Sequence, residues 1–222
     1  MKFNKKKVFV VSLAVSLIAI LSLGTLAWFN AKDEVTNRFK IAVSDQEGTP
    51  DFSVDVWEND STGQADTDGV EYENILPGDV IPKNPTVANT GFYEQWIRVY
   101  VTFDEYSIIE AACERNGITA DLRGWLNVDE TLWSKSDAEC KRNGHTMTYV
   151  YYYNNKLAKD AEAELFTKVT IPYQFEQEDM TYEDGDFSIS VKAEAVQASN
   201  TGTSAKDAFD YVGWEAGTEY DQ

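Results

Sequence analysis

The stretch Q95-W-I-R-V-Y-V-T-F-D104 carries the strongest fold signal in this chain of 222 residues. Aliphatic or aromatic residues recur at every second position, namely Ile97, Val99, Val101 and Phe103. A period of two places them on one face of a β-strand, whereas a helix would need a period of about 3.6. The stretch therefore predicts a strand with one face buried in a core.

The same alternation recurs on both sides of this strand. It is found in D51-F-S-V-D-V-W57, T148-Y-V-Y-Y-Y153, V169-T-I171 and F187-S-I-S-V-K-A-E-A-V196. Gly, Pro, Asn and Asp residues between the runs are suited to turns. Repeated short strands of this kind are typical of an antiparallel β-sandwich, so we expect an all-β domain.

Two short helical insertions are expected within this β framework. Glu105 to Asn116 carries apolar residues at helical spacing, and Gly117 follows as a C-terminal stop. Lys156 to Phe166 is rich in Ala, Glu, Lys and Leu, which favours a short helix or a turn.

The N-terminus has the features of an export segment. Met1 to Lys7 carries four lysines and no acid, and Val8 to Leu26 is apolar apart from Ser, Gly and Thr. As a helix this apolar run would span roughly 28 Å, close to the hydrocarbon thickness of a bilayer. T25-L-A27 supplies small residues where a signal peptidase needs them, so we expect cleavage between Ala27 and Trp28. The alternative is an uncleaved membrane anchor, because the run exceeds a usual signal-peptide core.

Cleavage there would leave 195 residues, enough for one domain with its own core. All 38 acidic residues but only 15 of the 19 basic ones lie beyond residue 27, so this part has a formal charge of −23. A field of that sign argues against nucleic acid or anionic lipid as a partner. It favours solubility outside the cell, binding of cations, or contact with basic surfaces.

The two cysteines, Cys113 and Cys140, would face an oxidising environment after export. One disulfide bridge between them is one interpretation, and two separate small core residues are the other. Sequence spacing does not decide between the two.

Metal binding is at most a weak expectation. The Asp-rich segment E58-N-D-S-T-G-Q-A-D-T-D-G69 fails the EF-hand template, because Ile75 would stand where a bidentate Glu is required. A looser calcium site from Asp60, Asp66, Asp68 or Glu71 is the alternative to a solvated turn. E183-D-G-D186 is interpreted as a hairpin turn. We therefore expect no cofactor, with calcium as the only weak candidate.

Catalytic chemistry has little support in the sequence. A catalytic zinc site usually needs two or more histidines among its ligands, and the chain has only His145. No G-x-S-x-G motif is present. The tyrosines of T148-Y-V-Y-Y-Y153 could form a carbohydrate platform, although such a stripe more often packs in a sheet. We predict no catalytic residue.

Several stretches resemble one known family. G24-T-L-A-W-F-N30 and N37-R-F39 resemble the junction of proteins processed by a SipW-type signal peptidase. L76-P-G-D-V-I-P-K-N-P-T-V-A-N-T-G91, leading into W96-I-R-V-Y-V101, is similar to the Pro-Gly-Asp…Lys-x-Pro-x-Val-x-Asn-Thr-Gly…Val-Arg-Val signature of TasA/camelysin-like proteins. Segments 151–157, 165–172 and 191–198 are similar to later core strands of that family, whereas A158-K-D-A-E-A163 replaces a Pro-Gly-containing turn.

The resemblance implies a jelly-roll β-sandwich that is exported, stays at the cell surface or in the extracellular matrix, and polymerises into biofilm fibres. It further implies that the mature N-terminal segment acts as a donor strand for the next subunit. The donor would run from Trp28 to Phe39, with Trp28, Phe29, Val35 and Phe39 as the pocket-filling residues. The alternative is that this segment is a frayed terminus or a strand of its own sheet.

The sequence thus predicts a signal peptide at 1–27 and a β-sandwich domain at 40–222, and the resemblance implies a possible donor strand at 28–39. The expected partners are a SipW-type signal peptidase and further copies of the chain, with membrane contact only through the N-terminal helix before cleavage. A camelysin-type surface metallopeptidase and a monomeric adhesin or ligand-binding module are the alternatives.

Overall fold

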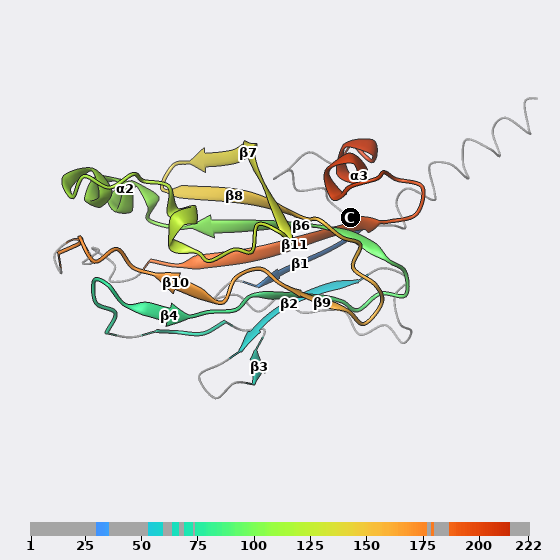
Figure 1. Cartoon of the computed structure of the whole chain (residues 1–222), viewed down its shortest axis with the longest axis horizontal. Coiled ribbons are helices and arrows are strands. Elements are labelled where there is room, and N and C mark those ends of the chain that lie inside the picture. The colour runs from blue at the N-terminus through green and yellow to red at the C-terminus, as the bar shows by residue number, and fades with distance from the viewer. Residues whose placement is uncertain are drawn as a thin grey trace, which may run out of the picture.

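The computed structural model describes residues 30–35, 53–59, 64–66, 69–72, 74–176, 179 and 187–213. Within them the chain forms antiparallel sheets with short helical insertions, so the predicted all-β fold class is confirmed (Figure 1).

One layer of the fold is a five-stranded antiparallel sheet. Its strands lie in the order β1 (Asn30–Val35), β11 (Ile189–Gln197), β6 (Gln95–Phe103), β8 (Thr146–Tyr153) and β7 (Trp133–Asn143). The first and last strands of the described residues are therefore neighbours.

The second layer faces this sheet from below in Figure 1. A four-stranded sheet has the order β3 (Ala65–Asp66), β2 (Val54–Asn59), β5 (Thr86–Asn89) and β9 (Glu162–Glu164). A separate antiparallel pair joins β10 (Lys168–Thr170) to β4 (Val80–Pro82).

The main core fills the space between the two layers. The predicted inner row of β6, from Ile97 to Phe103, is fully buried there against Val56 of β2 and Val87 of β5. Phe103 and Trp125 meet edge to face, with ring centroids 6.4 Å apart. The period-two pattern therefore identified the core face correctly.

The outer face of the five-stranded sheet is covered as well. Helix α3 (Ala205–Tyr211) packs on it and places Ala208 and Phe209 over Trp96, Tyr100 and Tyr152. This second cluster explains why β6 is buried on both faces rather than on one.

Helix α2 (Tyr106–Arg115) confirms the first expected insertion. The helix ends where predicted, because Gly117 has a φ of 65°, a conformation that glycine adopts at little cost. The Ile118 amide then donates to the Cys113 carbonyl at 2.8 Å and closes the last turn.

The helical alternative for Lys156 to Phe166 is wrong, since this segment forms a turn followed by β9. Its backbone groups bond across strands instead of along a helix. Leu157 exchanges two hydrogen bonds with Gln95, at 2.8 and 3.0 Å, and the Leu165 amide donates to Pro85. Tertiary pairing thus overrides the helix propensity of the composition.

Candidate assembly edge

Strand β1 forms one edge of the five-stranded sheet, next to β11 (Figure 1). The register runs from Asn30 opposite Val196 to Val35 opposite Val191. Residues 30–35 of the expected donor segment therefore form a strand of their own sheet. Val35 is the last residue of that strand.

Other residues assigned to the N-terminal segment lie outside the described residues. These are Ala27 and Trp28 of the cleavage junction, and the remaining pocket-filling residues Phe29 and Phe39.

Opposite charges are in register between β1 and β11. Lys32 stands opposite Glu194, and Glu34 stands opposite Lys192. Directly opposed charges of unlike sign contribute about 0.2–1 kcal/mol per pair, whereas like charges repel.

The sequence of β1 is poor in apolar residues. Of N30-A-K-D-E-V35 only Ala31 and Val35 are apolar. Because hydrophobic stabilisation scales with the apolar area removed from water, such a strand gains little from burial. Main-chain pairing with β11 is the contact that places β1 in this sheet.

Strand β11 pairs with a strand on each side, whereas β1 pairs with β11 on one side. Strand β11 pairs with β6 along its whole length, from Ile189 opposite Phe103 to Gln197 opposite Gln95. Ala193 and Ala195 are fully buried. Its pairing edge toward β1 is thus held in place by the core, independently of β1.

A buried ion pair fixes β11 to β6 beneath α3. The Arg98 Nη2 and Glu194 Oε2 atoms are 2.5 Å apart, and the two side chains are 1% and 2% exposed. The Tyr100 hydroxyl donates to the same carboxylate at 2.8 Å, and the guanidinium lies 4.1 Å from the Phe209 ring centroid. Burial by itself would lower the pKa of Arg98, but Tyr100 and Glu194 outweigh it and raise that pKa.

The opposite edge of the same sheet is built differently. Strand β7 carries a register shift against β8 between Ser136 and Lys141. Its solvent-exposed side chains include the charged residues Lys135, Asp137, Lys141 and Arg142. Bulges and exposed charges are the devices by which natural edge strands avoid pairing with other chains. Strand β7 therefore has the features of a protected edge.

Residues 76–91, which resemble the family signature, form a tight turn at their start and a hydrogen-bonded loop at their end. In L76-P-G-D79 the Leu76 amide donates to Asp79 Oδ2 at 2.8 Å, and Gly78 has a φ of 88°, as a type II turn requires. This turn leads into β4. At the other end of the signature, Asn89 is fully buried and shapes the loop before β6.

The amide nitrogen and the amide oxygen of the Asn89 side chain each make two hydrogen bonds. Its Nδ2 donates to the carbonyls of Tyr93 and Leu157, both at 2.9 Å. Its Oδ1 accepts from the Gly91 amide at 3.0 Å and from Gln95 Nε2 at 2.8 Å. One side chain thus holds residues 90–94 against the neighbouring loop.

Replacing Asn89 by alanine is expected to lower the free energy of unfolding by about 2–4 kcal/mol, since four hydrogen bonds of about 1 kcal/mol each are lost. Urea unfolding of residues 28–222 measures the change. Asn155→Ala, at an exposed position in the adjoining loop, is the matched control and should change stability by less than about 0.5 kcal/mol. Equal effects of the two variants would contradict the role given to Asn89.

Both cysteines are free thiols in the structure, which contradicts the interpretation that they form a disulfide. Cys113 is fully buried on α2, within the main core. Cys140 belongs to β7, and its Sγ donates to the Ser136 carbonyl at 3.2 Å. The alternative of two separate residues fits this placement.

The residues considered for chemistry that the structure describes belong to separate strands, helices and loops. His145 is exposed in the turn between β7 and β8. Among the calcium candidates, Asp66 is half-buried in β3 and Glu71 is exposed, while Asp60, Asp68 and the segment 183–186 lie outside the described residues. No group of three His, Cys, Asp or Glu residues suited to a metal occurs in the part of the chain that the structure describes.

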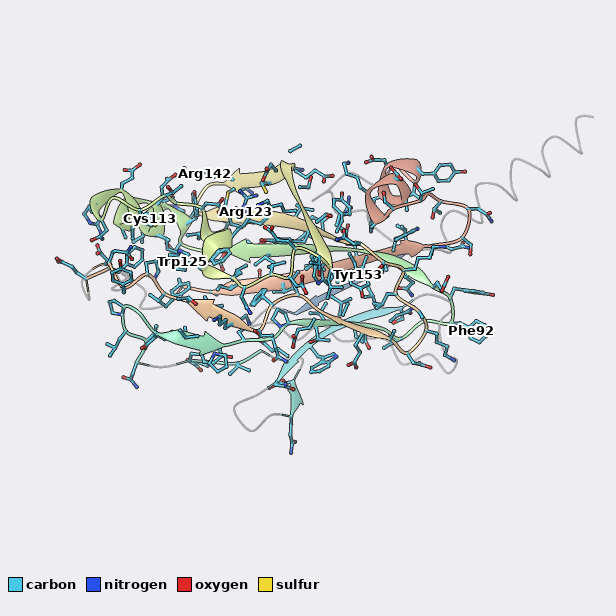
Figure 2. The ribbon with its side chains drawn as sticks, viewed as in Figure 1. Phe92, Cys113, Arg123, Trp125, Arg142 and Tyr153 are labelled. Carbon is cyan, nitrogen blue, oxygen red and sulfur yellow. The ribbon has the colours of Figure 1, made fainter. Side chains whose placement is uncertain are left out.

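The tyrosine stripe of β8 is a packing element. Tyr149, Tyr151 and Tyr152 are 2–4% exposed, so they offer no platform to a ligand. Tyr153, labelled in Figure 2, packs against Trp133 with ring centroids 4.9 Å apart and ring planes inclined at 48°. Burial raises the pKa of Tyr151 well above its ordinary value.

Within the described ranges, no helix has the length and apolar character needed to cross a membrane. No family model, curated protein or solved structure matches the chain.

Proposed function

We propose that this chain is an exported, non-enzymatic subunit of surface or matrix fibres, assembled by β-strand addition of its N-terminal segment. The observation that carries the proposal is the position of β1. The strand that begins two residues after the expected cleavage junction is an edge strand, paired on one side with β11. It can leave without breaking any other strand pair of the described sheet.

Exchange of β1 between chains would cost little. A second copy offers the same β11 edge, so the main-chain hydrogen bonds and the opposed charges of Lys32 and Glu34 would re-form between subunits. The low apolar content of β1 keeps the barrier to release small. Because each copy would donate at one place and accept at another, the contact is head to tail and generates a filament.

The resemblance of the signal junction and of the segment 76–101 to TasA/camelysin-like proteins supports the same function. In this proposal cleavage after Ala27 is the switch, because a donor segment still tethered to the bilayer cannot reach a neighbouring subunit. A SipW-type signal peptidase would then control when assembly begins.

The proposal is tested by comparing residues 28–222 with residues 40–222. We expect the first to form filaments visible by electron microscopy and the second to form none. A synthetic peptide of residues 28–39 should bind residues 40–222 by filling the β11 edge, and a scrambled peptide of the same composition should not. A strictly monomeric 28–222, or identical filaments from 40–222, would overturn the proposal.

A further inference from the structure

Three loops meet at the end of the sandwich where β1 begins, which we call the N-proximal end. They are residues 90–94 before β6, 154–161 after β8, and 198–204 after β11. The Ala198 amide donates to the Glu94 carbonyl at 3.0 Å, and Gln95 bridges to Leu157. Asn30 reaches the same end, because it is in register with Val196.

Two aromatic side chains protrude from this end. Phe92 and Tyr93 are 56% and 47% exposed, and their rings meet edge to face at 5.3 Å. Figure 2 shows Phe92 at the right-hand tip of the molecule, while β4 and β10 lie toward the other end in Figure 1. We call Phe92 and Tyr93 the aromatic lip.

The aromatic lip is held rigidly in this exposed position. The Asn89 side chain donates to the Tyr93 carbonyl and accepts from the Gly91 amide, so the backbone on both sides of Phe92 is fixed. Lys159 Nζ lies 5.0 Å from the centroid of the Phe92 ring. Exposed apolar side chains that lie together, as these two rings do, are suited to contact with a membrane or with another protein.

The export segment places a bilayer close to this end. Between Leu26, the last residue of the apolar run, and Asn30 of β1 the chain can extend at most about 14 Å. The polar interfacial layer of a bilayer is itself roughly 5–8 Å thick on each side. While residues 8–26 remain in the membrane, the N-proximal end must therefore lie at or near the headgroups.

The charge of the N-proximal end permits this approach. Its three loops carry Lys156 and Lys159 against Glu94 and Asp160, a formal charge of zero. The part of the chain beyond residue 27 has a formal charge of −23. These three loops therefore add no net negative charge that would oppose contact with a lipid surface.

We propose that the aromatic lip inserts into the interfacial layer of the membrane while the N-terminal segment is still attached. Aromatic side chains concentrate at this depth because their rings suit the boundary between hydrocarbon and water. The partner is a lipid surface, and the contact holds the junction after Ala27 at the membrane. This inference depends on the export segment and not on fibre formation, so either can fail without the other.

The test uses the full chain, residues 1–222, in phosphatidylcholine vesicles. A nitroxide label is attached at Phe92→Cys, or in a second variant at Tyr93→Cys, with Cys140 replaced by serine and the fully buried Cys113 left in place. Tyr173→Cys is the matched control, because Tyr173 is 79% exposed and follows β10 toward the other end of the molecule.

At positions 92 and 93 we expect oxygen dissolved in lipid to relax the label several-fold more than an aqueous nickel chelate does. At position 173 the order should be reversed. Aqueous behaviour at all three positions would overturn the proposal. Protection of positions 92 and 93 from both reagents would also overturn it, because it would indicate contact with another protein copy.

Discussion

Arg98→Ala is expected to lower the free energy of unfolding by about 3–5 kcal/mol, the usual cost of removing one partner of a buried ion pair. The substitution takes the guanidinium away from a carboxylate that is 2% exposed. Water cannot replace it readily, since α3 covers the site with Phe209. Urea unfolding of residues 28–222, followed by circular dichroism, measures the change.

Two controls separate the buried charge from other effects of this substitution. Lys206→Ala removes a cation from an exposed i,i+4 pair with Asp210 on α3, and should cost less than about 0.5 kcal/mol. Arg98→Met combined with Glu194→Leu removes both charges and should recover much of the loss. A loss below about 1 kcal/mol for Arg98→Ala would show that Glu194 is not held by this pair.

The strands that sequence predicted best are those with a complete local pattern. Q95-W-I-R-V-Y-V-T-F-D104 contains β6, and F187-S-I-S-V-K-A-E-A-V196 covers all of β11 except Gln197. In both, apolar residues of the inner face recur at every second position, so the core face could be assigned without knowledge of the neighbouring strands. Helix α2 could also be predicted from its own residues, because Gly117 marks its end.

Among the elements that were not predicted, β7 and α3 were missed for different physical reasons. W133-S-K-S-D-A-E-C-K-R-N143 has no apolar alternation, and β7 is held mainly by backbone pairing with β8. Helix α3 did have a local signal, since Ser204 stands three residues before Asp207 and accepts a hydrogen bond from the Asp207 amide at 3.2 Å. The double burial of β6 depends on α3 and could not be foreseen without it.

The candidate assembly edge could be predicted only in part. The resemblance to TasA/camelysin-like proteins suggested a pairing role for the segment that contains Asn30–Val35. Its partner could not be predicted, because β11 lies about 160 residues further along the chain and strand pairing is set by the fold. That Lys32 stands opposite Glu194 can be recognised only once that register is known.

Locking β1 to β11 by a disulfide is expected to abolish filament formation completely. Glu34→Cys and Lys192→Cys place two cysteines in register across the strands. Opposed residues in an antiparallel pair have Cα atoms about 4.5–5.5 Å apart, within the range of about 4.4–6.8 Å that a disulfide spans. A bridged strand cannot leave its own sheet, so oxidised residues 28–222 should stay monomeric, and adding reductant should restore filaments.

The matched control places the same crosslink between two strands that do not exchange. Thr102→Cys and Thr148→Cys join β6 to β8, where the two threonine hydroxyls already lie 2.8 Å apart. Both variants carry Cys140→Ser, so the introduced pair is the accessible one. Because β6 and β8 stay paired in any exchange of β1, the oxidised control should assemble like the unmodified chain. Filaments from the oxidised 34–192 variant would show that β1 remains in its own sheet in the fibre, and would exclude strand addition as the assembly mechanism.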